Sequence, residues 1–176
     1  MPPSIERKRD TEKVADIIRD AGGKIVGRTR LQKIAYLMEL AGLGSGFRFE
    51  YRHYGPYSEE LALAARTAAV VGLIGEEERE ASWGGLYSIF TARSPRGHSA
   101  KHNRVSLARE AQAADPIELE LAATAAFLFL QGSGDPWKAT AKLKPDKVGE
   151  GHLENARILY RKLQSLKTPR KLPNIG

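Results

Sequence analysis

The chain has 176 residues, of which 41% are hydrophobic and 28% charged, and it contains no cysteine. This composition is typical of a globular protein, and the missing cysteines exclude a disulfide framework, thiol catalysis and a cysteine-based zinc site. The N-terminus is charged and no run of 18 apolar residues occurs, so we expect a cytoplasmic protein without a secretory signal or a transmembrane helix.

The formal net charge of +7 admits an acidic partner, of which nucleic acid is the most obvious. The charge is unevenly distributed along the chain. The stretch 93–109 is basic and free of carboxylates, whereas residues 76–80 (EEERE) form an acidic cluster.

The first half of the chain predicts three helices, a strand and a β-hairpin. Apolar residues at helical spacing predict a helix that begins at Asp10 or Thr11 and another that Thr29 caps. Alternating aromatic residues from Phe47 predict a half-buried strand that Pro56 ends, and Ser58 is placed to cap a third, alanine-rich helix. The stretch 73–93 predicts the hairpin, with its turn at the glycine pair 84–85.

This order resembles a winged-helix arrangement over residues 1–94. We interpret residues 95–114 as a basic loop or linker, and residues 115–168 as C-terminal helices of the same globular unit, because Asp115-Pro116 and Asp135-Pro136 are strong helix starts. The tail, residues 169–176, contains proline and is expected to be flexible. The fold class is therefore mainly α with a small antiparallel β element (α+β). The lysines around Pro145 (Lys142, Lys144 and Lys147) are expected to lie in a solvated turn.

Two motifs carry a resemblance to a known family. They are a Leu-Gln-Lys-x-x-Tyr helix, made by Leu31, Gln32, Lys33 and Tyr36, and a Tyr-Gly-Pro turn at residues 54–56. Together they resemble the YwgA-like uncharacterised bacterial proteins and the wider Panacea domain of SocA-like antitoxins, over about the first half of the chain. The resemblance implies a non-enzymatic module, which in the Panacea group neutralises a cognate toxin by direct contact. For the YwgA-like group the implied function is open.

No nucleophile with a base, paired acids or metal-ligand set is visible in the sequence, so we expect no catalytic residues, no metal and no cofactor. The first hypothesis is therefore a protein-interaction module whose partner, such as a cognate toxin, contacts the aromatic corner. The corresponding residues are Arg52, His53, Tyr54 and Tyr57.

The alternative hypothesis is a winged-helix nucleic-acid binder that contacts the phosphate backbone through basic residues. The candidate residues are Arg28, Arg30, Lys33, Arg93, Arg96, Lys101 and Arg104. The third helix has only Arg66 set against Glu59 and Glu60, which is poor equipment for reading bases. No membrane partner is expected, and homo-oligomerisation stays open.

Overall fold

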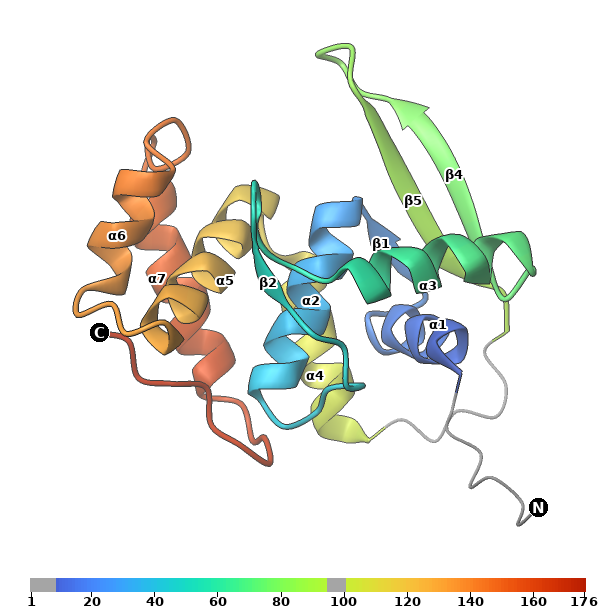
Figure 1. The fold of residues 1–176 in the computed structure, drawn as a ribbon, viewed down its shortest axis with the longest axis horizontal. Helices are drawn as coiled ribbons and strands as arrows, with labels where there is room; N and C mark the ends of the chain where they lie inside the picture. Colours follow the sequence, from blue (N-terminus) through green and yellow to red (C-terminus); the bar gives the residue numbers. More distant parts are fainter. Residues whose placement is uncertain (1–8, 95–100) are drawn as a thin grey trace.

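The structure is a computed structural model that describes residues 9–94 and 101–176. Its first part alternates helices and short strands, in the order α1 (Asp10–Asp20), β1 (Lys24–Val26), α2 (Arg28–Leu40), β2 (Glu50–Arg52), β3 (Gly55–Tyr57), α3 (Glu59–Val70), β4 (Ile74–Glu80) and β5 (Leu86–Ala92). The second part is helical, with α4 (His102–Ala113), α5 (Pro116–Leu130), α6 (Pro136–Leu143) and α7 (His152–Gln164). The expected α+β class is confirmed (Figure 1).

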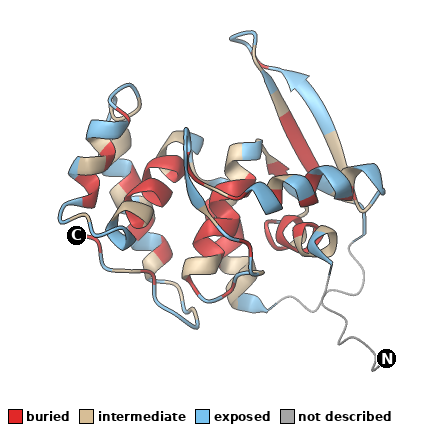
Figure 2. Ribbon diagram, viewed as in Figure 1, coloured by how far each residue is buried: buried red, intermediate tan, exposed pale blue. Residues whose placement is uncertain are grey.

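A three-stranded antiparallel sheet has the strand order β1-β5-β4, and β2 pairs with β3 in a separate two-stranded hairpin. The register of the long hairpin runs from Ile74 opposite Ala92 to Glu80 opposite Leu86. Strand β1 joins the other edge of β5, where Ile25 lies opposite Phe90. Both Ile25 and Phe90 are buried, so the base of the sheet belongs to the core, while its far end projects from the body (Figures 1 and 2).

The centre of the protein is formed by α2 and α5 (Figure 2). Every residue from 31 to 38 in α2 and from 119 to 126 in α5 is buried. The alanines at 122, 123, 125 and 126 allow neighbouring elements to approach α5 closely, because they add little side-chain volume. Helix α5 is therefore the central core helix. Among the described residues, no helix is long and apolar enough to cross a membrane.

The start of α5 follows its sequence signal. Asp115 accepts hydrogen bonds from the backbone N–H groups of Ile117 and Glu118, and Pro116 occupies the first turn. Asp135 caps α6 in the same way, through the N–H of Lys138. Ser58 accepts from Leu61 N at the start of α3. These predictions are confirmed because each signal acts within one turn of the residue that carries it.

Three predictions about the bounds of helices, strands and loops are wrong. Residues 102–113 form α4 rather than a loop, since Leu107, Ala108 and Ala111 lie at helical spacing and are buried. Residues 95–100 of the proposed linker lie outside the described residues. The expected strand from Phe47 is shorter, because only Glu50–Arg52 pairs, and the chain returns immediately as β3. Helix α2 begins at Arg28 after Gly27, not after Thr29.

The C-terminal tail has no helix or strand, but it is packed against the molecule. Leu172 and Ile175 are buried. Tyr160 donates its hydroxyl hydrogen to the Pro173 carbonyl at 2.7 Å, and Trp137 donates its indole N–H to the Gly176 carbonyl at 2.9 Å. The prediction of a flexible tail is therefore corrected: two apolar side chains and the carbonyls beside them have partners on α6 and α7.

Candidate functional site: the β2–β3 hairpin and its support

The β2–β3 hairpin presents four consecutive exposed side chains from Tyr51 to Tyr54. Tyr51 is 38% exposed and Tyr54 is 51% exposed. The rings of His53 and Tyr54 lie edge to face, with their centroids 4.9 Å apart. Arg52 forms an ion pair with Glu50 and lies with its guanidinium carbon 6.0 Å from the centre of the Tyr57 ring. The structure thus brings the predicted partner-binding residues Arg52, His53, Tyr54 and Tyr57 together on one hairpin.

Helix α2 holds this hairpin from one side. Gln32 donates its amide hydrogen to the Ser58 carbonyl at 2.9 Å and accepts from the Ser58 backbone N–H at 2.8 Å. The next residue, Lys33, donates from Nζ to the Pro56 carbonyl at 2.7 Å. All of these groups are buried, and the hydrogen bonds satisfy backbone polar groups that no sheet neighbour could reach. Proline fits in β3 because the strand belongs to a two-stranded sheet and this edge needs no N–H donor.

Helix α5 supports the hairpin from beneath. Gly55 has a φ of +90°, and a Cβ atom added there would lie 2.5 Å from Thr124 Oγ1. Only glycine therefore allows this turn to rest directly on α5. The aromatic side of the support comes from Tyr36, whose ring lies 5.3 Å from that of Phe49 and 6.0 Å from that of Phe127.

A buried charge cluster lies between α5 and the segment that follows α6. Glu120 accepts from Lys144 Nζ at 2.7 Å and from Lys147 Nζ at 2.7 Å, and its side chain is only 5% exposed. Lys144 also donates to the His53 carbonyl at 3.3 Å, and Lys147 Nζ lies 4.8 Å from the centre of the Tyr54 ring. The expected solvated turn is wrong for Lys144, which is buried because Glu120 provides an ion-pair partner. The cluster ties the hairpin to the C-terminal half.

Lys33 differs from these lysines because no carboxylate of a described residue forms an ion pair with it, although it is only 1% exposed. Burial lowers the pKa of Lys33 from 10.5 to about 7. The nearby Glu120 opposes this shift in pKa, while Lys144 and Lys147 add to it. The Pro56 carbonyl and the charge of Glu120 offset only part of the cost of desolvating a cation in this position.

The basic residues proposed for phosphate binding mostly serve the fold. Arg30 donates to the carbonyls of Gln112 and Ala114 at the end of α4. Arg104 pairs with the buried Asp20 at 2.8 Å. The half-buried Arg30 and Arg104 and the buried Lys33 all donate to carbonyl or carboxylate groups of the protein, so they are not available to a phosphate backbone at the surface.

Among the other candidates, Arg28 lies 3.2 Å from Glu76 and 3.1 Å from Glu78, so the acidic cluster of β4 neutralises it. Arg93 and Lys101 are exposed. Arg96 lies outside the described residues. The structure therefore does not gather the predicted basic residues into one exposed patch.

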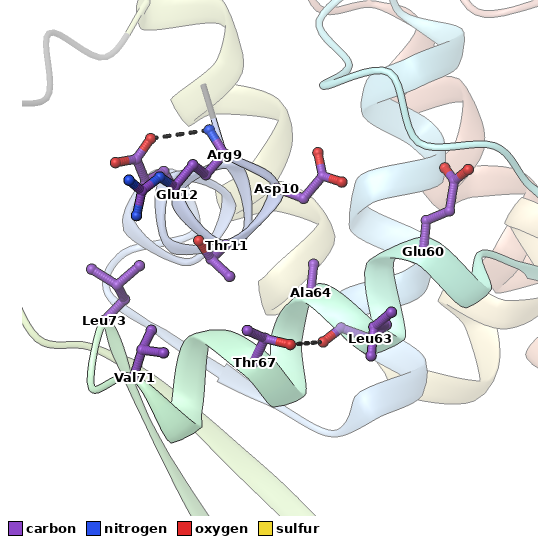
Figure 3. A pocket seen from close by; sticks show the side chains of 10 residues that line it. All are labelled: Arg9, Asp10, Thr11, Glu12, Glu60, Leu63, Ala64, Thr67, Val71 and Leu73. Atoms are coloured by element: carbon purple, nitrogen blue, oxygen red, sulfur yellow. Dashed lines mark hydrogen bonds between the residues drawn. The ribbon is translucent and has the colours of Figure 1, made fainter. Parts of the chain in front are cut away.

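The outward face of α3 is apolar and acidic. Leu63 and Val71 are 57% and 60% exposed, and they line a groove toward the start of α1 together with Leu73 (Figure 3). The rim of the groove carries Arg9 and the carboxylates of Asp10, Glu12 and Glu60 (Figure 3). A surface of this charge would repel a phosphate backbone.

Asp115, Glu118 and His152 bring together atoms of the kind that bind metal ions, and the sequence does not reveal this group because His152 is far from the other two in the chain. His152 Nδ1 lies 3.4 Å from Glu118 Oε1 and 4.0 Å from Asp115 Oδ1. Both carboxylates already have other partners: Asp115 caps α5, and Glu118 accepts from Asn155 Nδ2 at 2.9 Å. We interpret the group as a polar contact that joins the start of α5 to the start of α7.

The comparisons with known proteins place the similarity in a limited part of the chain. No known protein family's profile matches it. It is similar to the uncharacterised protein YwgA of Bacillus subtilis (strain 168), with 31% identity over 68 residues, which is 39% of this chain and 40% of that protein. The chain thus matches well under half the length of this relative.

The two motifs that carry the resemblance contact each other in space. Gln32 and Lys33 from the Leu-Gln-Lys helix bind the backbone at Ser58 and Pro56, which belong to the Tyr-Gly-Pro turn and the residues after it. Sequence reasoning found both motifs but not this connection, because hydrogen bonds to carbonyl groups leave no pattern in the residues that accept them. The motifs thus define how the hairpin is held.

Proposed function

We propose that the protein is a non-enzymatic protein-interaction module, similar in kind to the Panacea domain of SocA-like antitoxins, and that its partner binds the β2–β3 hairpin. The observation that carries the proposal is the contrast within this hairpin. Its backbone is held by buried polar contacts from α2 and from the segment after α6, yet four consecutive side chains from Tyr51 to Tyr54 face solvent.

Such a surface suits a protein partner for two physical reasons. Tyrosine and arginine are enriched among the residues that dominate the energy of protein interfaces. A hairpin whose backbone is already held in place loses little further conformational entropy on binding, so more of the contact energy contributes to affinity. Tyr51, Arg52 and Tyr54 supply this combination of residue types on one supported element.

The nucleic-acid alternative has less support. In the winged-helix interpretation of residues 1–94, α3 would be the helix placed in the major groove. Its outward residues include Leu63, Val70 and Val71, with Arg66 as its basic side chain. Such a helix provides few donors for base edges. The same exposed apolar residues are suited to packing against another protein.

Site-specific crosslinking in the native bacterium tests the proposal. Tyr54 is replaced by the photocrosslinking amino acid benzoylphenylalanine, and the same replacement at Trp83, an exposed aromatic residue at the tip of the β4–β5 hairpin, provides the control. We expect one discrete protein adduct from position 54 that is absent from position 83. The identified partner is then purified, and its affinity is measured for Arg52→Ala and Tyr54→Ala. Loss of a central aromatic or arginine contact is expected to weaken binding about 30-fold.

A partner whose affinity does not change in either variant would contradict binding at the hairpin. The matched control for these substitutions is Arg79→Ala, which removes an exposed arginine that is paired with Glu77 in the same way that Arg52 is paired with Glu50. If the adjacent gene encodes a toxin, co-expression should restore growth with the unmodified protein and with Arg79→Ala, but not with Tyr54→Ala.

Fluorescence anisotropy with duplex DNA separates the two hypotheses. We expect no saturable binding at low salt. Binding that weakens steeply as salt rises, and that weakens further in Arg93→Ala or Lys101→Ala, would instead favour the nucleic-acid alternative.

A further inference from the structure

A cavity of about 310 Å³ lies between the start of α2, the β2–β3 hairpin, α3 and the base of the β4–β5 hairpin. This volume lies at the lower end of the range of small-molecule sites. Its apolar lining comes from Leu31, Ala62, Ala65 and Phe90, and Tyr54 and Tyr57 form one wall. The cavity is thus shaped by elements from three separate parts of the chain.

The charged residues of the lining are unbalanced. Arg28, Lys33 and Arg66 face a single carboxylate, that of Glu76. Glu76 is already occupied, since it accepts from Ser88 Oγ at 2.7 Å and from Arg28 at 3.2 Å. Within the described part of the chain, no carboxylate pairs with Arg66 or Lys33. Arg66 therefore has no neutralising partner among the described residues, and Lys33 has the Pro56 carbonyl but no carboxylate as a direct partner.

The backbone adds positive potential to the same place. Helix α2 begins at Arg28, has no side-chain cap hydrogen bond at its N-terminus and has no acidic residue in its first turn. Its first N–H groups and its dipole therefore lack the negative group that usually lies at such a position. Residues of this first turn, Arg28 and Thr29, line the cavity.

From these observations we propose that the cavity binds a small organic anion, in which a carboxylate or phosphate group contacts Arg66, Lys33 and the start of α2, and an apolar or aromatic body packs against Tyr57, Ala65 and Phe90. The bound anion supplies the negative charge that Lys33 lacks, and it enters a site that is already shaped. Tyr54 and Tyr57 also belong to the proposed partner surface, so a ligand here would lie directly behind that surface. The proposal itself does not require a protein partner.

The test uses the purified full chain with phenyl phosphate and benzoate as probes and phenol as their neutral counterpart, measured by NMR titration and calorimetry. We expect saturable one-to-one binding of at least one anionic probe, with chemical-shift changes at Leu31, Ala65 and Phe90. Phenol should bind at least about tenfold more weakly, because it cannot form the charge-assisted hydrogen bonds of the anions. Inorganic phosphate should also bind more weakly than phenyl phosphate.

The variants locate the site. Arg66→Gln removes an exposed cation whose side chain forms no ion pair or hydrogen bond with the described residues, and it should weaken binding of the anionic probe about tenfold. Arg161→Gln removes an exposed arginine of α7 and should leave binding unchanged. Ala62→Leu should weaken binding by occupying part of the cavity, and it does so without changing a charge. An unchanged affinity in both Arg66→Gln and Ala62→Leu, equal affinity for phenol and the anions, or no saturable binding of either anion would overturn the proposal.

Discussion

Gln32 of α2 binds both backbone groups of Ser58, a residue 26 positions further along the chain. The side-chain amide acts as a substitute for a neighbouring strand, since it offers one donor and one acceptor in the direction that a strand would. Ser58 in turn caps α3 through its hydroxyl oxygen. The end of the β2–β3 hairpin and the start of α3 are therefore positioned by a single glutamine.

Replacing Gln32 tests this arrangement. Gln32→Ala leaves a buried N–H and a buried carbonyl of Ser58 without partners, so we expect the free energy of unfolding to fall by about 2–5 kcal/mol. Urea denaturation measures the change, and Gln131→Ala, at an exposed position after α5, provides the control. A loss below about 0.5 kcal/mol for Gln32→Ala would show that water replaces the amide.

Lys33 predicts a dependence of stability on pH. Burial lowers the pKa of Lys33 from 10.5 to about 7 in the folded protein, so between these values the unfolded chain binds more protons than the folded one. Stability should therefore rise with pH in this window, by at most about 1.4 kcal/mol per pH unit from this group. The free-energy cost of keeping Lys33 uncharged in the fold is absent above pH 10.5, where the unfolded chain is uncharged at this residue too. This cost grows, and stability falls, as the pH decreases toward 7.

Urea denaturation at several pH values between 7.5 and 9.5 checks this slope, below the range in which tyrosine ionisation intervenes. Lys33→Met should remove the rise, because methionine has a similar shape and no titrating group. Lys138→Met, at an exposed position in α6, should keep it. An identical slope in the unmodified protein and in Lys33→Met would refute the assigned pKa of Lys33.

Glu120 is expected to be the residue of the charge cluster that tolerates substitution least. Glu120→Gln leaves the buried Lys144 and the partly buried Lys147 without a counter-charge, which should cost about 3–5 kcal/mol of stability. The double variant Glu120→Gln with Lys144→Met should recover part of this loss, because Lys147 is closer to solvent. Denaturation of the single and double variants gives the coupling energy, with Glu154→Gln as an exposed control. Purely additive losses would argue against a direct interaction.

Leu172 tests whether the tail belongs to the folded unit. Leu172→Ala should lower the free energy of unfolding by about 2–5 kcal/mol, the range for a leucine truncated in a packed core. The adjacent Lys171→Ala, which is exposed, should change stability by less than about 0.5 kcal/mol. Thermal or urea denaturation distinguishes the two, and equal effects would mean that the tail detaches in solution.

Several elements could be predicted from the sequence because their signals are local. Asp115 and Asp135, each followed by proline, mark the starts of α5 and α6, and the glycine pair at 84–85 lies in the β4–β5 turn. Residues 95–114 were expected to be a loop, because the stretch is basic and begins with Pro95 and Gly97, which disfavour a helix, but α4 starts only after them. Its buried positions at Leu107 and Ala111 already had helical spacing.

The exposed residues of the candidate site could be predicted from the sequence, but the contacts that hold the β2–β3 hairpin in place could not. The Tyr-Gly-Pro turn indicated a corner with Arg52, His53 and Tyr54, and the structure places these residues together on the β2–β3 hairpin. The contacts that hold the hairpin come from Gln32 and Lys144, which lie far away in the chain. Whether a lysine is solvated or buried depends on which carboxylate or carbonyl the fold brings to it.

The positions of the main helices and of the β4–β5 hairpin follow from local patterns in the sequence, because capping, periodicity and turn preference act over a few residues. The role of each basic residue depends on the fold. Arg30, Lys33 and Arg104 looked equivalent to any other cation, but desolvation makes a buried charge unfavourable unless a carbonyl or carboxylate meets it, and the fold supplies those partners. Within residues 9–94 and 101–176, Arg66 and Arg93 have no such partner, and both are exposed.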